Sequence, residues 1–280
     1  MLPRIHSLFP TREEVTINQG LAYSDHLPIL AKVPLGEENT SLNIISLNIL
    51  GGITFSGIHA LGQREEEEEM IERYQRIADG LIKGAQEHDV DVILLQEASE
   101  DIIPILRNSL GNDWEIIAQS GIISCYNKQR LIQQSSTYDN TARVHSFTFA
   151  DQANGGQTID VHNIWGNYSP LSHHLEDDCR TKLVTTNSQV SIIIGDTNSR
   201  IAPLDDQKRN LTTGAIPGKI NELLGYSAEL QIPDHPDGGF YRRVDGTIQQ
   251  LAIQILDFAT GEIIEDDRSQ EEIGCWPEYR

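Results

Sequence analysis

Short apolar runs separated by turn-forming residues recur along the chain and predict β-strands. Runs of this length, bounded by Gly, Pro, Asn, Asp and Ser, are typical of buried strands. The first two, at residues 27–33 and 42–48, are joined by a segment rich in turn formers, which predicts a β-hairpin. The remaining runs predict strands at residues 90–95, 114–118, 121–126, 130–135, 143–149, 157–164 and 190–195, with a turn at Gly155 and Gly156.

Helical periodicity is clearest in residues 63–87. The apolar residues of this segment recur at intervals of three and four, which places them on one face of an α-helix. Glutamates occupy its first turns, where the helix dipole favours negative charge. Further helices are expected at residues 100–109, at 171–187 and near 217–225. Residues 199–240, rich in Pro, Gly and Asp, are expected to be dominated by loops.

The succession of these elements indicates the fold class. Helices separate only some of the predicted strands, which favours two packed β-sheets flanked by helices in a mixed α/β fold. Neither an internal repeat nor a linker-like segment interrupts the chain. We therefore expect residues 1–280 to form a single domain.

Charge and composition narrow the functional classes. The chain has 21 Lys and Arg residues against 42 Asp and Glu residues, and its net charge of −21 disfavours broad contact with a nucleic-acid backbone. We interpret the acidic stretches at Glu65–Glu69 and Glu262–Glu272 as solvated surface, with a protein-binding patch as the alternative.

Cellular location follows from three further features. No apolar run reaches the ~18 residues of a membrane span. The N-terminus lacks the apolar core of a signal peptide. Cys125, Cys179 and Cys275 are widely spaced and match no metal-ligand pattern, so we interpret them as reduced thiols. These features predict a cytoplasmic protein, or a secreted effector without a cleaved signal peptide.

Several predicted strands end in polar residues of one chemical kind. Strand 42–48 ends in an amide and strand 92–97 in a carboxylate, and the run at 192–198 presents a carboxylate and an amide after a glycine. An Asp-His pair also precedes the apolar run at 27–33. Such side chains, delivered to one edge of a sheet, suit a hard divalent cation and a phosphate ester. The residues concerned are Asn48, Glu97, Asp196, Asn198, Asp25 and His26.

These four motifs resemble the signature of the endonuclease/exonuclease/phosphatase superfamily. In that family one strand ends in Asn and another in Gln-Glu, and a Gly-Asp-x-Asn turn and a Ser-Asp-His turn complete the site; here these motifs are Asn48, Gln96-Glu97, Gly195–Asn198 and Ser24–His26. The resemblance covers most of residues 20–200. It implies the DNase I-like fold, a four-layered α/β sandwich with two central β-sheets flanked by helices.

The order of the motifs departs from the family. Ser-Asp-His lies near the C-terminus in the family, whereas here it lies at residues 24–26, ahead of the first predicted strand. Because the family's last strand pairs beside its first, a short connection between them leaves the site intact if the chain is cut elsewhere. The hairpin at residues 27–48 supplies that connection. We therefore expect a circularly permuted domain.

The resemblance assigns a role to each motif. Glu97 is implied as a metal ligand together with Asn48 and Asp25, and the cofactor is implied to be Mg²⁺ or Mn²⁺. Asp196 is implied as the general base that activates water. Asn198 is implied to position that water or a phosphate oxygen, and His26 to donate a hydrogen bond to a non-bridging oxygen in the transition state.

The partner that orients His26 has two candidates. In the family it is the Asp of an Arg-Ile-Asp strand. Residues 4–9 have the expected placement, but His6 stands where that Asp belongs, whereas Arg243-Val-Asp245 has the chemistry without a following apolar run. We take Asp245 as the preferred candidate and leave residues 4–9 as the alternative.

Candidate substrate contacts follow residue 161. The family has Asn-x-His or Asn-x-Tyr at this strand end; here Trp165 stands at that position, and an indole cannot accept a hydrogen bond. Asn163 and Asn167 remain candidates to contact the phosphate. Arg200 and the adjacent Arg242 and Arg243 are candidate phosphate clamps, with ordinary surface charge as the alternative.

Two functional hypotheses result. The first is a metal-dependent phosphoester hydrolase, either a nuclease or phosphodiesterase or a phosphatase, that acts on a short nucleic acid, a phosphorylated small molecule or a lipid headgroup. The run after Gly195 resembles both inositol-polyphosphate 5-phosphatases and deadenylases, so the substrate stays open. The second is a catalytically degenerate member that binds a protein partner through its acidic surface, which Trp165 and His6 favour.

Overall fold

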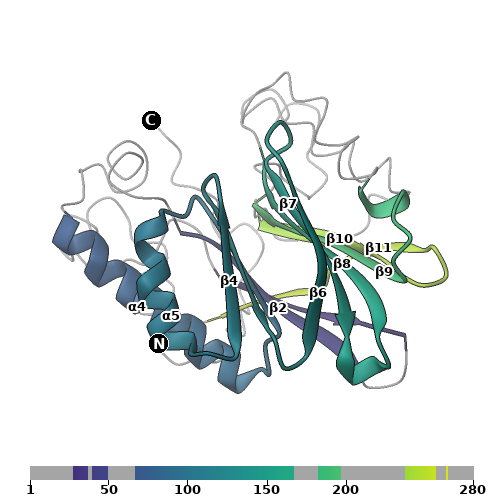
Figure 1. Cartoon of the computed structure of the whole chain (residues 1–280), viewed down its shortest axis with the longest axis horizontal. Helices are drawn as coiled ribbons and strands as arrows, with labels where there is room; N and C mark the ends of the chain where they lie inside the picture. Colours follow the sequence, from purple (N-terminus) through teal and green to yellow (C-terminus); the bar gives the residue numbers. More distant parts are fainter. Residues whose placement is uncertain are drawn as a thin grey trace, which may run out of the picture. The chain divides into compact units, whose positions relative to one another are not determined.

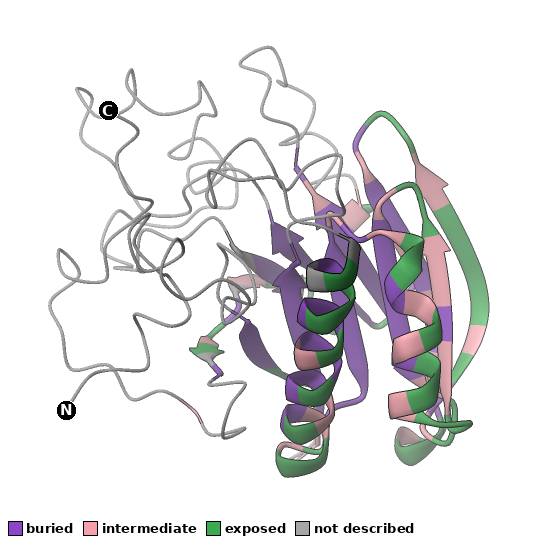
Figure 2. Cartoon of the chain, turned by 90° about the vertical axis from the view of Figure 1, so that its left-hand side faces the viewer, coloured by how far each residue is buried: buried purple, intermediate pink, exposed green. Residues whose placement is uncertain are grey.

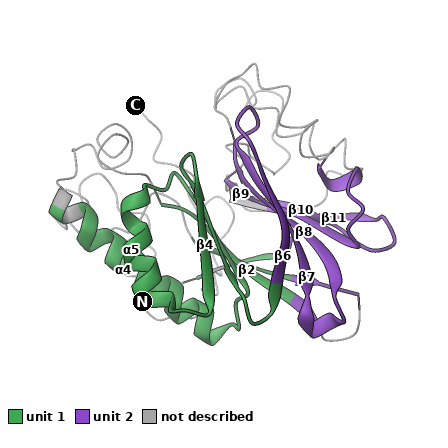
Figure 3. Cartoon of the chain, in the orientation of Figure 1, with its two compact units in different colours: residues 1–32, 42–131, 253–265 green, residues 33–41, 132–252, 266–280 purple. Residues whose placement is uncertain are grey.

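A computed structural model describes residues 28–36, 40–49, 67–166, 182–196, 237–256 and 263. The chain divides into two compact units, one made of residues 1–32, 42–131 and 253–265 and the other of residues 33–41, 132–252 and 266–280 (Figure 3). Among the helices in the described ranges, none is both long enough and apolar enough to cross a lipid bilayer.

The first sheet has six strands in a mixed arrangement (Figure 1). Its order is β12 (Ile253–Ile255), β1 (Ile29–Pro34), β2 (Ser41–Asn48), β3 (Val92–Gln96), β5 (Ile122–Asn127) and β4 (Trp114–Gln119). β1 and β2 are neighbours joined by a short connection, in which the Leu35 N–H donates to the Thr40 carbonyl over 3.0 Å, so the predicted hairpin is confirmed. β2 and β3 run parallel, and Asn48 lies opposite Gln96.

Helices cover the first sheet as the apolar periodicity predicts. Helix α4 (Glu67–Glu87) buries Met70, Tyr74, Ile77 and Leu81 in one cluster with residues of β2 and β3. A 3₁₀ turn, η1 (Glu100–Ile102), leads into α5 (Ile103–Leu110), which contributes Leu106 to the same cluster. Figure 2 shows the buried strands behind these two helices, whose exposed residues lie on the side toward the viewer.

The second sheet also has six strands, in the order β11 (Ile248–Gln250), β10 (Asp237–Arg242), β9 (Val190–Asp196), β8 (Gln157–Trp165), β7 (Val144–Asp151) and β6 (Leu131–Asp139). A 3₁₀ turn, η2 (Gln152–Asn154), and the left-handed Gly155 and Gly156 connect β7 to β8. β8 and β9 run parallel, so their carboxyl ends meet at one edge. Residues 182–184 are helical, and Leu183 packs with Val144, Ile164 and Ile193 on one face of this sheet.

Most predicted elements are confirmed, and one prediction is wrong. The two mixed six-stranded sheets with few helices are the expected α/β fold class. Residues 237–240, the end of the region expected to be dominated by loops, belong to strand β10 (Asp237–Arg242), which pairs with β9. The layering of the sheets, the single domain and the permutation stay predictions. Much of the helix expected at 171–187 and all of that near 217–225 lie outside the described residues.

Candidate active site

The ends of β2 and β3 bring two predicted metal ligands together. Because the strands are parallel and in register, Asn48 and Glu97 leave the sheet at the same edge. Asn48 is fully buried, and its side-chain amide donates to the Glu97 carboxylate over 2.9 Å. Glu97 itself is half-buried, so its carboxylate reaches both the amide and solvent.

The main chain around Glu97 is fixed on both sides. The Ile49 N–H donates to the Gln96 carbonyl over 2.9 Å, and the Ala98 N–H donates to the Gly121 carbonyl over 2.8 Å. Between these bonds Glu97 has a φ of +48°, in the left-handed region that costs a non-glycine residue roughly 1–2 kcal/mol. Strain of this kind concentrates at functional sites, where the surrounding structure enforces it.

A buried arginine supports this strand edge, and sequence reasoning missed it. Arg73 lies in α4 with 2% of its surface exposed, and its Nη1 donates to the Ile49 carbonyl over 2.6 Å. Its guanidinium also lies 5.2 Å from the centre of the Tyr74 ring. The signal was its spacing, because residue 73 lies three residues after Met70 and four before Ile77, within the buried stripe of the helix.

The donor set of Asn48 and Glu97 fits a magnesium-type ion. Mg²⁺ prefers oxygen ligands, keeps several waters and is held by one or two protein carboxylates. Glu97 supplies a carboxylate and Asn48 an amide oxygen. In the described ranges there is no group of three or more His, Cys, Asp or Glu side chains that forms a denser metal cluster. Asp25, the third predicted ligand, lies outside those ranges.

A second set of candidates lies at the carboxyl ends of β8 and β9, in the second unit. Asp196 ends β9, is fully buried and lies opposite Trp165 of β8. The Gly166 N–H donates to the Asp196 carbonyl over 2.7 Å, which continues the pairing past the end of β8. Asn163, also fully buried, lies two residues before Trp165 and therefore on the same face of the sheet.

His162, between these candidates in sequence, belongs to the opposite face. Its ring nitrogens lie 2.8 Å from the Ser146 hydroxyl and 3.2 Å from the Ser191 hydroxyl. Burial lowers the pKa of His162 to about 4, an effect that Asp160 opposes and Lys182 reinforces, so the ring is neutral at pH 7. This largely buried network links β7, β8 and β9.

Asp245 and Arg243 lie in an exposed turn between β10 and β11. The Thr247 N–H donates to the Asp245 carboxylate over 2.9 Å, and this bond lowers the pKa of Asp245. The neighbouring Arg242 uses its guanidinium differently, donating to the Leu183 carbonyl over 2.5 Å and to the Ser188 carbonyl over 2.7 Å. The roles of Asp245 and Arg243 stay predictions, as do those of four candidates outside the described residues, His26, Asn167, Asn198 and Arg200.

Comparison with known proteins gives matches among solved structures alone. No family model matches the sequence, and no curated protein does. Many of the matched solved structures belong to the endonuclease/exonuclease/phosphatase family. One from Bacteroides thetaiotaomicron is 13% identical with a TM-score of 0.42, and the match covers 58% of this chain and 64% of that one. Another from Bacteroides vulgatus is 14% identical with a TM-score of 0.39, covering 49% of this chain and 63% of that one.

A third match is ANGEL2, described as a 2',3'-cyclic phosphatase. It is 17% identical with a TM-score of 0.40, and the match covers 62% of this chain and 60% of that chain. The chain thus spans slightly under two thirds of the length of each of these proteins.

Proposed function

We propose that this protein is a metal-dependent phosphoester hydrolase. The observation that carries the proposal is the 2.9 Å hydrogen bond between Asn48 and Glu97 at the ends of two parallel strands. It holds a half-buried carboxylate and an amide at one sheet edge, on a strained and doubly fixed main chain. Glu97 and Asn48 are the proposed ligands of a Mg²⁺ or Mn²⁺ ion, with Asp25 as the third.

The proposed reaction is attack of water on the phosphorus atom of an ester. When bound, the cation supplies positive charge that offsets the negative charge of the phosphoryl oxygens. Asp196 accepts a proton from the attacking water, which general-base catalysis requires. Asn198 orients that water, and Asn163 donates its amide hydrogens to the phosphate. His26 donates to a non-bridging oxygen as charge builds up, and Asp245 is the proposed partner that orients its ring.

The charge of the chain favours a small substrate. With twice as many acidic as basic residues and a net charge of −21, the protein as a whole repels a long polyanion. A short nucleic acid, a phosphorylated small molecule or a lipid headgroup carries fewer phosphates and incurs less repulsion. Arg200 and Arg243 are proposed to offset the remaining charge of such a substrate.

The test is hydrolysis of bis-p-nitrophenyl phosphate and p-nitrophenyl phosphate with Mg²⁺, with Mn²⁺ and after chelation. We expect turnover that depends on the metal and falls by about 10²–10⁴-fold in Asp196→Asn, the range for a lost general base. Glu97→Gln is expected to lose activity together with metal affinity. Glu72→Gln is the matched control, because Glu72 is an exposed glutamate of α4.

Two results would overturn the proposal. The first is turnover that persists after chelation, and the second is turnover that Glu97→Gln and Asp196→Asn leave unchanged. Complete inactivity toward both esters, with or without metal, favours instead the non-catalytic protein-binding module considered from the sequence. Circular dichroism of each variant keeps a loss of folding separate from a loss of chemistry.

A further inference from the structure

An arginine lies against the indole at the end of β8. The guanidinium carbon of Arg143 is 4.3 Å from the centre of the Trp165 ring. The main-chain N–H of Trp165 donates to the Arg143 carbonyl over 3.0 Å, so the two residues are also neighbours through their main chains. Trp165 in turn lies opposite Asp196 of β9. Arg143, Trp165 and Asp196 therefore form one row across the edge of the second sheet.

The turn before β7 holds Arg143 in this position. The Asp139 carboxylate accepts from the main-chain N–H groups of Thr141 and Ala142, over 3.0 and 3.1 Å. Ala142 is buried in the cluster with Leu183, and Val144 begins β7. Between them Arg143 has a φ of +50°, which disfavours every residue except glycine by roughly 1–2 kcal/mol. A positive φ at a residue other than glycine makes Arg143 a candidate functional residue.

Stacking leaves the binding edge of this guanidinium available. An arginine that lies face-on to an aromatic ring keeps its N–H groups in the plane of the guanidinium, where they form a planar fork for phosphate. Arg143 is half-exposed, and among the described residues it makes no ion pair with a carboxylate. An arginine that makes no ion pair within the described ranges is suited to an external anion.

We propose that Arg143, stacked on Trp165, binds the phosphoryl oxygens of the substrate at the edge of the second sheet that carries Asp196. This inference rests on the proposed function and names a further substrate-binding residue for it. Trp165 is a positioning residue that acts through Arg143. The cationic fork also offsets the repulsion between a phosphate and the Asp196 carboxylate. The Trp165 indole cannot accept a hydrogen bond. Its proposed role is to hold the Arg143 guanidinium, which donates to the phosphate.

The first test is kinetic. Arg143→Gln is expected to lower kcat/KM for p-nitrophenyl phosphate by about 10- to 100-fold, as expected for one charge-assisted contact. Arg143→Lys is expected to recover only part of that loss, because an ammonium neither stacks as a plane nor binds two oxygens in a fork. Trp165→Phe keeps a ring and is expected to lose less than Trp165→Ala. Arg107→Gln is the control, because Arg107 is an exposed arginine of α5.

The second test needs no turnover and separates this inference from the proposed function. Binding of inorganic phosphate is followed by calorimetry and by tryptophan fluorescence, with Trp165→Phe identifying the share of the signal that comes from residue 165. We expect phosphate to bind the wild type about 10- to 100-fold more tightly than Arg143→Gln. Inactive protein that still binds phosphate through Arg143 contradicts the proposed function and supports this inference.

Arg143→Gly protects the test against a folding artefact. Glycine adopts a positive φ without strain, so this variant is expected to be at least as stable as the wild type while it lacks the guanidinium. If Arg143→Gly and Arg143→Gln bind inorganic phosphate and turn over ester as the wild type does, the inference is wrong. If both bind phosphate weakly while Arg107→Gln does not, it holds.

Discussion

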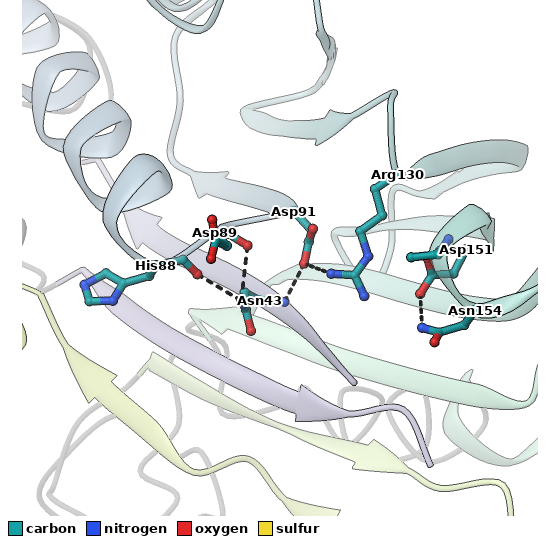
Figure 4. A network of polar contacts seen from close by, with 8 residues as sticks. Asn43, His88, Asp89, Asp91, Arg130, Asp151 and Asn154 are labelled. Carbon is teal, nitrogen blue, oxygen red and sulfur yellow. Dashed lines mark hydrogen bonds and ion pairs between the residues drawn. The ribbon is translucent and has the colours of Figure 1, made fainter. Parts of the chain in front are cut away.

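The β2–β3 pair has a carboxylate at each end, and the two carboxylates are held differently. At the start of β3, Asp91 is 5% exposed, and its Oδ2 accepts from the Asn43 main-chain N–H over 2.9 Å and from Arg130 Nη1 over 2.6 Å (Figure 4). The Asn43 side-chain amide donates to the carbonyls of His88 and Asp89 over 2.9 and 3.1 Å. These hydrogen bonds tie the Asp91 carboxylate and the Asn43 amide to protein partners, so the arrangement stabilises the fold.

At the other end of the pair, Glu97 is half-buried and strained. In the described part of the chain it makes no ion pair, and its carboxylate accepts from the Asn48 amide over 2.9 Å. The Glu97 main chain has a φ of +48°, and the oxygen lone pairs of its carboxylate are open to solvent. A residue in this state adds little to the stability of the fold. If Glu97 has the proposed catalytic role, stability and chemistry are separated along one strand pair, and mutation tests this separation.

The largest expected effect on stability is at the Asp91 end. Asp91→Ala leaves the Arg130 guanidinium and the Asn43 N–H without their acceptor, which is expected to lower the free energy of unfolding by about 3 kcal/mol. Urea denaturation measures this loss. A double-mutant cycle with Arg130→Gln assigns the share that belongs to the ion pair. Because Asp91 has no proposed role in the chemistry, folded Asp91→Ala protein should keep its turnover. A variant as stable as the wild type would remove the structural half of the contrast.

Arg73 tests how the Glu97 end is supported. Arg73→Met removes the donor to the Ile49 carbonyl, directly after Asn48, and is expected to weaken Mn²⁺ binding by roughly 10- to 100-fold, as loss of a supporting contact does at metal sites. Arg73→Lys retains a donor and should recover part of the affinity. Lys83→Met, on the exposed side of α4, is the control. Calorimetric titration with Mn²⁺ gives the affinities, and equal values for Arg73→Met and wild type would show that Arg73 does not position the ligands.

The second unit should respond to pH through His162. Its folded pKa of about 4 lies below the ordinary value of 6.5, so the unfolded chain binds more protons between these values. Stability therefore falls as the pH decreases through this window, by about 2 kcal/mol between pH 7 and pH 5. Urea denaturation at both pH values measures the loss, and His162→Gln should show a smaller one. His145, whose pKa burial also lowers to about 4, contributes in the same direction. An equal pH dependence in the His162→Gln variant would contradict this assignment.

Local patterns predicted most of the fold, and one strand shows where they fail. Short apolar runs bounded by turn formers, together with one helical period, predicted the hairpin, α4 and the strands from β3 to β9. β10 was missed because Asp237-Gly-Gly has the composition of a turn. Packing requires glycine at residue 239, because a Cβ there would clash with the Ile193 carbonyl oxygen of β9. Such a contact between distant residues has no local signal.

The candidate site was predictable to the extent that it lies at strand ends. Asn48, Glu97 and Asp196 each follow an apolar run, and the structure places each at the end of its strand. Arg73 and Arg143 were missed because an isolated arginine is most often surface charge. The burial of Arg73 has a local signal, its position within the apolar stripe of α4, whereas the position of Arg143 over an indole is a tertiary contact. Sequence spacing does not show that Arg73 contacts the Ile49 carbonyl or that Arg143 lies over the Trp165 ring.

The smallest expected effect isolates the strain at Glu97. Glycine accepts a φ of +48° and alanine does not, so Glu97→Gly is expected to be about 1 kcal/mol more stable than Glu97→Ala. Both variants lack the carboxylate and should be equally inactive. Glu72 provides the opposite control: in the interior of α4, Glu72→Gly should be about 1 kcal/mol less stable than Glu72→Ala. The two pairs thus differ in sign through backbone conformation alone. If the glycine variant is less stable than the alanine variant at both residue 97 and residue 72, the Glu97 main chain is not strained. Its backbone conformation then does not distinguish Glu97 from an ordinary turn residue.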